Sequence, residues 1–128
     1  MYEVPEPPPA ATGPVDPAVV EELRAELDDQ ELLLEIISTF LDDSVRRLDS
    51  IVQAATRPDP TVLRAQAHAL KGSAGTFGAR QLSELCHELE YANQEPPSKH
   101  TSDLVNSIVV EHQRVHQTLL LMLRTGAN

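Results

Sequence analysis

Apolar residues recur at the spacing of an α-helix through most of this chain, and the longest such stripe covers about six turns between Leu33 and Ala55. Aspartate-proline pairs stand at Asp16-Pro17 and Asp59-Pro60. These pairs suit the start of a helix, because aspartate caps the free backbone N–H groups and proline needs no partner at the first position. No window shows the alternating pattern and hairpin turns of a sheet. The sequence therefore predicts an all-α fold.

Proline and glycine divide this pattern into five expected helices, at about residues 17–27, 29–55, 60–78, 79–94 and 101–126. Short links favour an up-down-up-down antiparallel four-helix bundle, with the first short helix covering one end. Residues 1–15 are rich in proline and are expected to form a disordered tail, which leaves residues 16–126 as the bundle domain. The positions expected to face the core are Val20, Leu23, Leu27, Leu33, Ile36, Ile37, Phe40, Leu41, Val45, Leu48, Ile51, Val52, Ala55, Leu63, Leu70, Ala74, Phe77, Leu82, Leu85, Cys86, Leu89, Leu104, Ile108, Val115, Leu119 and Met122.

Composition narrows the choice of partner and compartment. The 128 residues carry a net charge of −10, which argues against nucleic acid or an anionic membrane as the main partner. The single cysteine forms no internal disulfide, and neither a secretory signal nor a membrane-spanning run is visible. We expect a cytoplasmic protein, and a monomer, since a bundle with its own core needs no second copy.

The charge is unevenly distributed along the chain. Between residues 60 and 83 there are three basic residues, Arg64, Lys71 and Arg80, and no acidic residue. A positive patch on an acidic protein should attract an anionic site on a partner.

The same segment contains the main candidate for chemistry, His68. In a helix, Arg64, His68, Lys71, Gly72 and Gly75 would share one face. Glycine inside a helix costs roughly 0.5–1 kcal/mol relative to alanine, so two glycines beside a histidine need a reason. The reason we favour is room for a partner that docks on the ring.

Phosphoryl transfer fits this arrangement. A neutral imidazole nitrogen is a competent nucleophile towards phosphorus and a good leaving group once phosphorylated. The ammonium of Lys71, one turn away, could neutralise charge on the phosphoryl oxygens. This face offers no metal ion and no acidic residue for the in-line step, so we expect the partner to supply both.

The stretch from His68 to Glu90 closely resembles the histidine-containing phosphotransfer (HPt) domains of two-component phosphorelays. It reads His-Ala-Leu-Lys-Gly-Ser-Ala-Gly-Thr-Phe-Gly-Ala-Arg-Gln-Leu-Ser-Glu-Leu-Cys-His-Glu-Leu-Glu. The resemblance implies that His68 is phosphorylated, that Lys71 steadies the phosphoryl group and that Gly72 keeps the approach open. It also implies that Gly78 shapes the turn after the helix.

Such domains have no kinase or phosphatase activity of their own. The resemblance implies that the chain accepts a phosphoryl group from a receiver-domain aspartate and passes it to another, with receivers of response regulators or of a hybrid sensor kinase as partners. Arg64, Gly72, Gly75 and Arg80 would contribute to docking. We expect no cofactor on this chain and Mg²⁺ on the receiver.

Other candidate sites are weaker. Glu84 and His87 have the spacing of one half of a di-iron motif, but the other half is missing and both should face solvent. His112 and His116 could in principle bind zinc, but no further ligand is suitably spaced, so they are expected to be partly exposed helix residues. Cys86 lies on an apolar stripe, where a thiol is usually inert. The remaining alternative function is a helical adaptor that binds a signalling partner without transferring phosphate.

Overall fold

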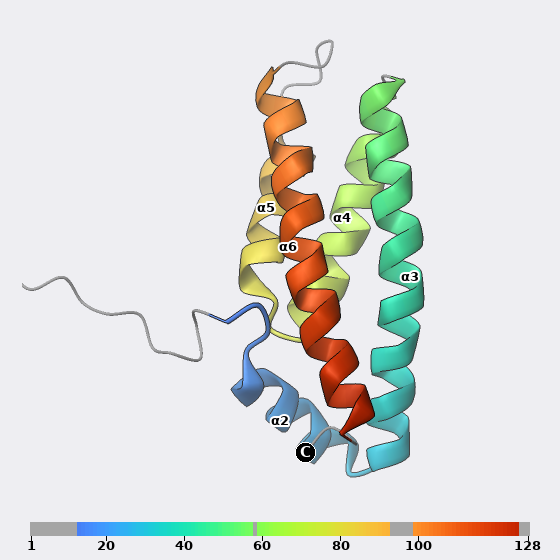
Figure 1. Ribbon diagram of the computed structural model, residues 1–128, viewed down its shortest axis with the longest axis vertical. Coiled ribbons are helices and arrows are strands. Elements are labelled where there is room, and N and C mark those ends of the chain that lie inside the picture. The colour runs from blue at the N-terminus through green and yellow to red at the C-terminus, as the bar shows by residue number, and fades with distance from the viewer. Residues whose placement is uncertain (1–12, 58, 93–98, 126–128) are drawn as a thin grey trace, which may run out of the picture.

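The computed structural model describes residues 13–57, 59–92 and 99–125, which fold into helices joined by short links (Figure 1). The helices are α2 (Pro17–Leu27), α3 (Gln30–Thr56), α4 (Pro60–Thr76), α5 (Arg80–Glu90) and α6 (Lys99–Arg124). Each of the last four packs against two of the others, in the order α3, α4, α5, α6 and back to α3. Successive helices of this group run in alternating directions in Figure 1, and α2 lies at one end of the group, where it contacts α3. The prediction of an all-α fold with a short N-terminal helix is confirmed.

Aspartates begin three of the helices, as their positions predicted. Asp16, Asp29 and Asp59 each accept a hydrogen bond from a backbone N–H two or three residues further on, at 3.0–3.2 Å. Asp28 instead ends α2, with a left-handed φ of 51°. The helix predicted over residues 79–94 is too long at its C-terminal end, because α5 stops at Glu90 and the chain turns away.

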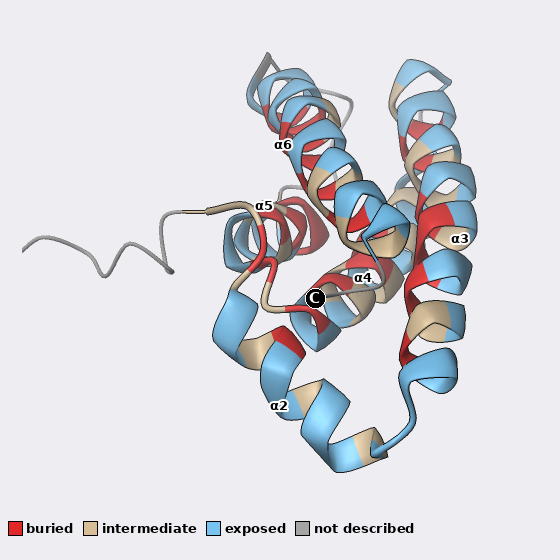
Figure 2. Ribbon diagram, turned by 60° about the horizontal axis from the view of Figure 1, so that its bottom comes forward, coloured by how far each residue is buried: buried red, intermediate tan, exposed pale blue. Residues whose placement is uncertain are grey.

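Buried residues line the inner faces of α3, α4, α5 and α6, and exposed residues line the outer faces (Figure 2). Phe40 of α3 and Phe77, which follows α4, meet edge to face with ring centroids 5.2 Å apart. The buried apolar residues are Val15, Val20, Leu33, Ile37, Phe40, Leu41, Ile51, Ala54, Ala67, Leu70, Ala74, Phe77, Ala79, Leu82, Cys86, Leu89, Leu104, Val105, Ile108, Val115 and Leu119. Burial raises the pKa of the Cys86 thiol to about 12, in keeping with the inert role predicted for it.

Two valines predicted to face the core do not. Val45 and Val52 are 47% and 37% exposed. The neighbouring position Ser44 is buried instead, because its hydroxyl lies 2.9 Å from Nε2 of His112 on α6. A buried hydroxyl with a hydrogen-bond partner is tolerated in a core, and apolar periodicity alone cannot reveal such a pair.

The prediction that His112 is partly exposed is therefore wrong. His112 is only 5% exposed, and the centroid of its ring lies 5.7 Å from that of the His116 ring. Burial, together with the nearby His116, lowers the pKa of His112 to about 4. Its imidazole is consequently neutral at physiological pH and belongs to the contact between α3 and α6.

Gly78 lies in the turn between α4 and α5, and the residues at the start of α2 pack against it. Its φ of +66° is the left-handed conformation predicted for it. A Cβ here would lie 2.7 Å from Cβ of Asp16 and 2.9 Å from Cβ of Val19, and the backbone N–H of Asp16 donates to the Gly78 carbonyl at 3.1 Å. Only glycine satisfies both the conformation and the close packing.

The packed chain begins earlier than predicted. Most of the proline-rich tail assigned to residues 1–15 lies outside the described residues, but residues 13–15 are described and Val15 is only 3% exposed. Apolar burial at Val15 therefore extends the bundle domain by at least one residue beyond its predicted start at Asp16.

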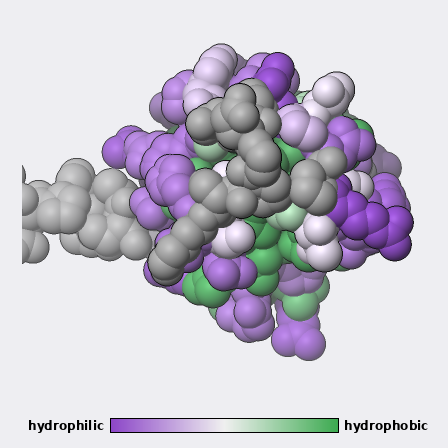
Figure 3. Space-filling view, turned by 90° about the horizontal axis from the view of Figure 1, so that it is seen from above, coloured by the Kyte–Doolittle hydropathy of each residue, from purple (hydrophilic) through white to green (hydrophobic). Residues whose placement is uncertain are grey.

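Seen from the end at which α3 ends and α6 begins, hydrophilic side chains ring the molecule, and hydrophobic surface shows mainly between them (Figure 3). Among the described helices, none is long and apolar enough to cross a membrane.

Candidate functional site

The candidate site lies where α4 packs against α5. The buried face of α4 is formed by small or aliphatic residues, Ala67, Leu70 and Ala74, which allow α5 to approach closely. The hydroxyl of Ser83 on α5 donates to the backbone carbonyl of Lys71 at 3.3 Å and links the two helices. His68 stands at the edge of this contact with 67% of its side chain exposed.

Glu90, the last residue of α5, joins the two residues predicted to act on phosphate. One carboxylate oxygen, Oε2, lies 2.7 Å from Nδ1 of His68, and the other, Oε1, accepts a hydrogen bond from the Lys71 ammonium at 2.7 Å. The Glu90 side chain is only 9% exposed, so the protein holds it in place beneath the more exposed imidazole.

The charges in this group stabilise one another. The hydrogen bond from Lys71 is the main cause that holds the pKa of Glu90 below its ordinary value, and the contact with His68 adds to it. The same hydrogen bond raises the pKa of Lys71. Both side chains are therefore charged at neutral pH, and the pairing is lost only as acid protonates Glu90.

An ionised carboxylate accepts hydrogen bonds and cannot donate one. The short contact with Glu90 therefore assigns the proton of a neutral His68 ring to Nδ1 and leaves the lone pair on Nε2. The imidazole ring is largely exposed, and its contact with Glu90 fixes both its tautomer and its orientation. The site therefore presents the nucleophilic Nε2 to solvent.

Lys71 has two further neighbours on α5. Its ammonium lies 3.4 Å from Nδ1 of His87 and 5.6 Å from the centre of the Tyr91 ring. The rings of His87 and Tyr91 are themselves 4.8 Å apart. The side chain of Lys71 is 23% exposed, so its ammonium is held against α5 and does not project from the outer face of α4 beside His68.

The glycines of α4 leave open surface, as predicted. A Cβ added at Gly72 or Gly75 would meet nothing within 4 Å. Arg64 and Arg80 are both exposed. The positive patch predicted from the sequence is weaker at its centre, because Glu90 lies outside the acid-free segment in the chain but pairs with Lys71 in the fold.

This face of α4 has no acidic residue, as predicted, but Glu90 brings a carboxylate to the site from α5, which the sequence analysis did not foresee. The sequence could have placed Glu90 near His68, since His68 stands ten residues before Gly78 and Glu90 stands twelve residues after it. In two antiparallel helices joined at that glycine, positions at similar distances from the turn lie side by side. His87, nine residues after Gly78, could have been placed near Lys71, seven residues before it, by the same reasoning.

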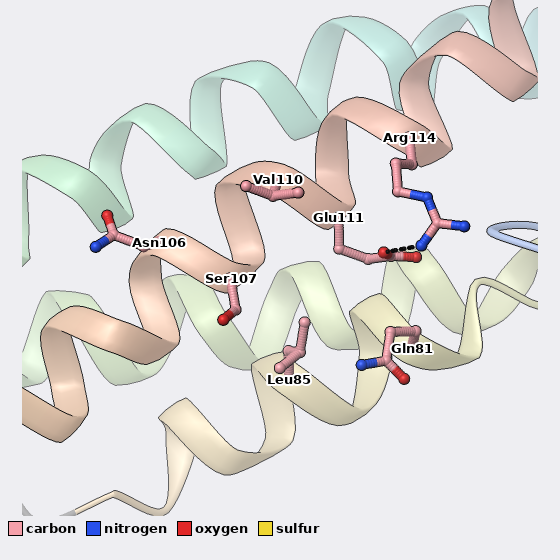
Figure 4. Close-up of a pocket in the computed structure, with 7 residues that line it drawn as sticks. All are labelled: Gln81, Leu85, Asn106, Ser107, Val110, Glu111 and Arg114. Carbon is pink, nitrogen blue, oxygen red and sulfur yellow. Dashed lines mark hydrogen bonds and ion pairs between the residues drawn. The ribbon is translucent and has the colours of Figure 1, made fainter.

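A separate groove of about 390 Å³ lies on the other side of α5, against α6 (Figure 4). Its lining includes Leu85, which is only half-buried although it was predicted to face the core, and the ion pair of Glu111 with Arg114 at 2.9 Å. None of the residues that surround His68 lines it. The groove therefore does not belong to the candidate site.

Comparison with known proteins assigns the family. A family model described as "Hpt domain" matches residues 35–124, from the first turns of α3 to the end of α6. The chain therefore belongs to the Hpt domain family, whose members are histidine phosphotransfer proteins of phosphorelays and exchange phosphoryl groups with receiver domains.

A solved structure supports this assignment. The chain is similar to histidine-containing phosphotransfer protein B (HptB) from Pseudomonas aeruginosa PAO1, with a TM-score of 0.80 and 25% sequence identity. The alignment covers 89% of this chain and 97% of that one. No curated protein sequence gives a significant match.

Proposed function

We propose that His68 is the phosphorylated residue and that this protein carries a phosphoryl group from the aspartate of one receiver domain to the aspartate of another. The observation that carries the proposal is the exposed imidazole with Nδ1 held 2.7 Å from the Glu90 carboxylate. This arrangement frees Nε2 towards the partner. The protein itself would have no kinase or phosphatase activity.

The transfer step needs no proton to move. Nε2 attacks phosphorus, the N–P bond forms, and the P–O bond breaks as the receiver's carboxylate leaves with its electron pair. The ring then carries a positive charge with the proton still on Nδ1, facing the Glu90 carboxylate. In the reverse step an aspartate attacks phosphorus, and His68 departs as a neutral imidazole.

Lys71 supplies the positive charge nearest to the transferred group. Its long side chain can turn from Glu90 towards the phosphoryl oxygens, which carry about two negative charges. The cationic ring of phosphorylated His68 would then balance the charge of Glu90, as the Lys71 ammonium does before transfer.

The remaining requirements fall on the partner. Phosphoryl transfer needs further neutralisation of charge, and we propose that Mg²⁺ bound to the receiver provides it, with no cofactor on this chain. Arg64 and Arg80 would attract the receiver, and Gly72 and Gly75 would let it approach the ring. The proposed partners are receiver domains of response regulators or of a hybrid sensor kinase. The proposal also includes a cytoplasmic location and a monomeric state.

The test is incubation of the protein with a panel of phosphorylated receiver domains. We expect phosphate that is labile in acid and stable in alkali to appear on the wild type and not on His68→Gln. The matched control is His100→Gln, because His100 is an exposed histidine on α6, and it should be labelled like the wild type.

Two results would overturn the proposal. Labelling of the His68→Gln variant would place the phosphate elsewhere. Absence of labelling from every receiver, with binding of a receiver retained, would instead indicate the adaptor function.

A further inference from the structure

Tyr91 is the most exposed large hydrophobic residue among those that the structure describes, with 68% of its surface accessible. It caps the C-terminal end of α5, where its backbone N–H still donates to the carbonyl of His87 at 3.2 Å. The backbone position of Tyr91 is therefore fixed by the helix, whereas most of its ring lies in solvent.

By its position in the helix Tyr91 belongs to an outer face of α5 that carries two carboxylates, and its ring also lies 5.6 Å from the Lys71 ammonium. Glu84, Glu88 and Tyr91 are spaced four and three residues apart, so they lie on one side of the helix, and all three are exposed. An aromatic ring with carboxylates beside it attracts a cation, since the face of the ring and the carboxylates are both negative.

This face continues directly into the His68 site. Tyr91 follows Glu90 in the chain, its ring is 5.6 Å from the Lys71 ammonium, and the His87 ring lies between α5 and that ammonium. A protein that covers His68 from the α5 side would therefore reach Tyr91 as well.

We propose that Tyr91, with Glu84 and Glu88, is a docking site for a cationic side chain of the receiver domain and helps to determine which receivers this protein serves. The inference rests on the proposed function, and it extends the docking surface proposed around α4 and Arg80 along α5 to its C-terminal end. Lysine or arginine of the receiver would stack on the exposed ring with a carboxylate beside it.

The chemistry of the partner supports a cation. A domain that holds an aspartyl phosphate needs cationic groups near it to balance the negative phosphoryl oxygens, even where acidic residues bind its metal ion. A cationic side chain at the rim of that site would be complementary to carboxylates and an aromatic ring placed beside the accepting histidine. Tyrosine is also among the residues that contribute most to binding when they lie at a protein interface.

The experiment compares Tyr91→Ala and Tyr91→Phe with the wild type. The partner is the receiver domain that binds the wild type most tightly, chosen from a panel of receivers. We expect alanine to raise the apparent KM for the phosphorylated receiver roughly tenfold with kcat nearly unchanged, and phenylalanine to preserve both. Glu84→Gln combined with Glu88→Gln should raise KM and weaken its dependence on salt. Val110→Ala removes an exposed apolar group from α6 and should change nothing.

Two outcomes would overturn the inference. A fall in kcat at constant KM would show that Tyr91 acts only by holding Lys71, and wild-type values for Tyr91→Ala would show that it contacts no receiver. Binding of the unphosphorylated receiver, measured in His68→Gln and in His68→Gln combined with Tyr91→Ala, separates this question from the phosphotransfer itself. A tenfold loss of affinity there supports the docking site even if no phosphate is transferred, and equal affinities contradict it.

Discussion

Oε2 of Glu90 lies 2.7 Å from Nδ1 of His68, although 22 residues separate the two in the chain. The contact depends on the packing of α4 against α5, which places an acidic residue behind the histidine. It fixes the tautomer of the ring and would give a phosphorylated ring a counter-charge.

Glu90→Gln should slow phosphoryl transfer to His68 roughly tenfold, because hydrogen bonds to a charged acceptor are about twice as strong as those to a neutral one. The measurement is the single-turnover rate from a saturating phosphorylated receiver. Glu26→Gln, on the exposed surface of α2, is the control and should keep the wild-type rate. If both variants transfer at the wild-type rate, the carboxylate has no part in the reaction.

Gly72→Ala should make the protein more stable and less active. Alanine is favoured in a helix by roughly 0.5–1 kcal/mol, and its Cβ would meet nothing within 4 Å at this position. Chemical denaturation should show the gain in unfolding free energy, and Gly72→Leu should block receiver docking. Normal transfer by the leucine variant would show that the open surface serves no partner.

Several features of the fold could be predicted from the sequence because they depend on local chemistry. Asp16-Pro17 and Asp59-Pro60 cap helices through contacts within a few residues, and Gly78 marks its turn through its own conformation. The exposed position of His68 followed from its place opposite the apolar residues of its helix.

Local sequence patterns could not predict the contacts between helices. Ser44 is polar and was not expected in the core, and it is buried because His112 meets it from α6, 68 residues away. Glu90 was overlooked because the charge count covered a segment of chain, whereas the electrostatic field acts through space. In both cases the missing information was which faces of two helices meet.

Gly78→Ala should strongly destabilise the protein, in contrast to Gly72→Ala. Alanine would have to adopt a φ near +66°, which costs about 1 kcal/mol, and its Cβ would collide with Asp16 and Val19. We expect a loss of roughly 2 kcal/mol or more in unfolding free energy, measured by urea denaturation. Equal stability of the two alanine variants would mean that the start of α2 does not pack against this turn.

The stability of the bundle should fall between pH 7.5 and pH 5 because of His112. Burial lowers its pKa to about 4, below the value of about 6.5 in an unfolded chain, so the unfolded state binds more protons in this range. The corresponding stability is fully present above pH 6.5 and is lost as the pH falls, by about 2 kcal/mol at pH 5 relative to neutral pH. Urea denaturation at the two pH values measures the difference. His112→Gln, which keeps a hydrogen-bonding group opposite Ser44, should remove most of the pH dependence, whereas His100→Gln on the exposed surface of α6 should retain it. An unchanged pH dependence in His112→Gln would mean that the buried imidazole is not the group that acid titrates.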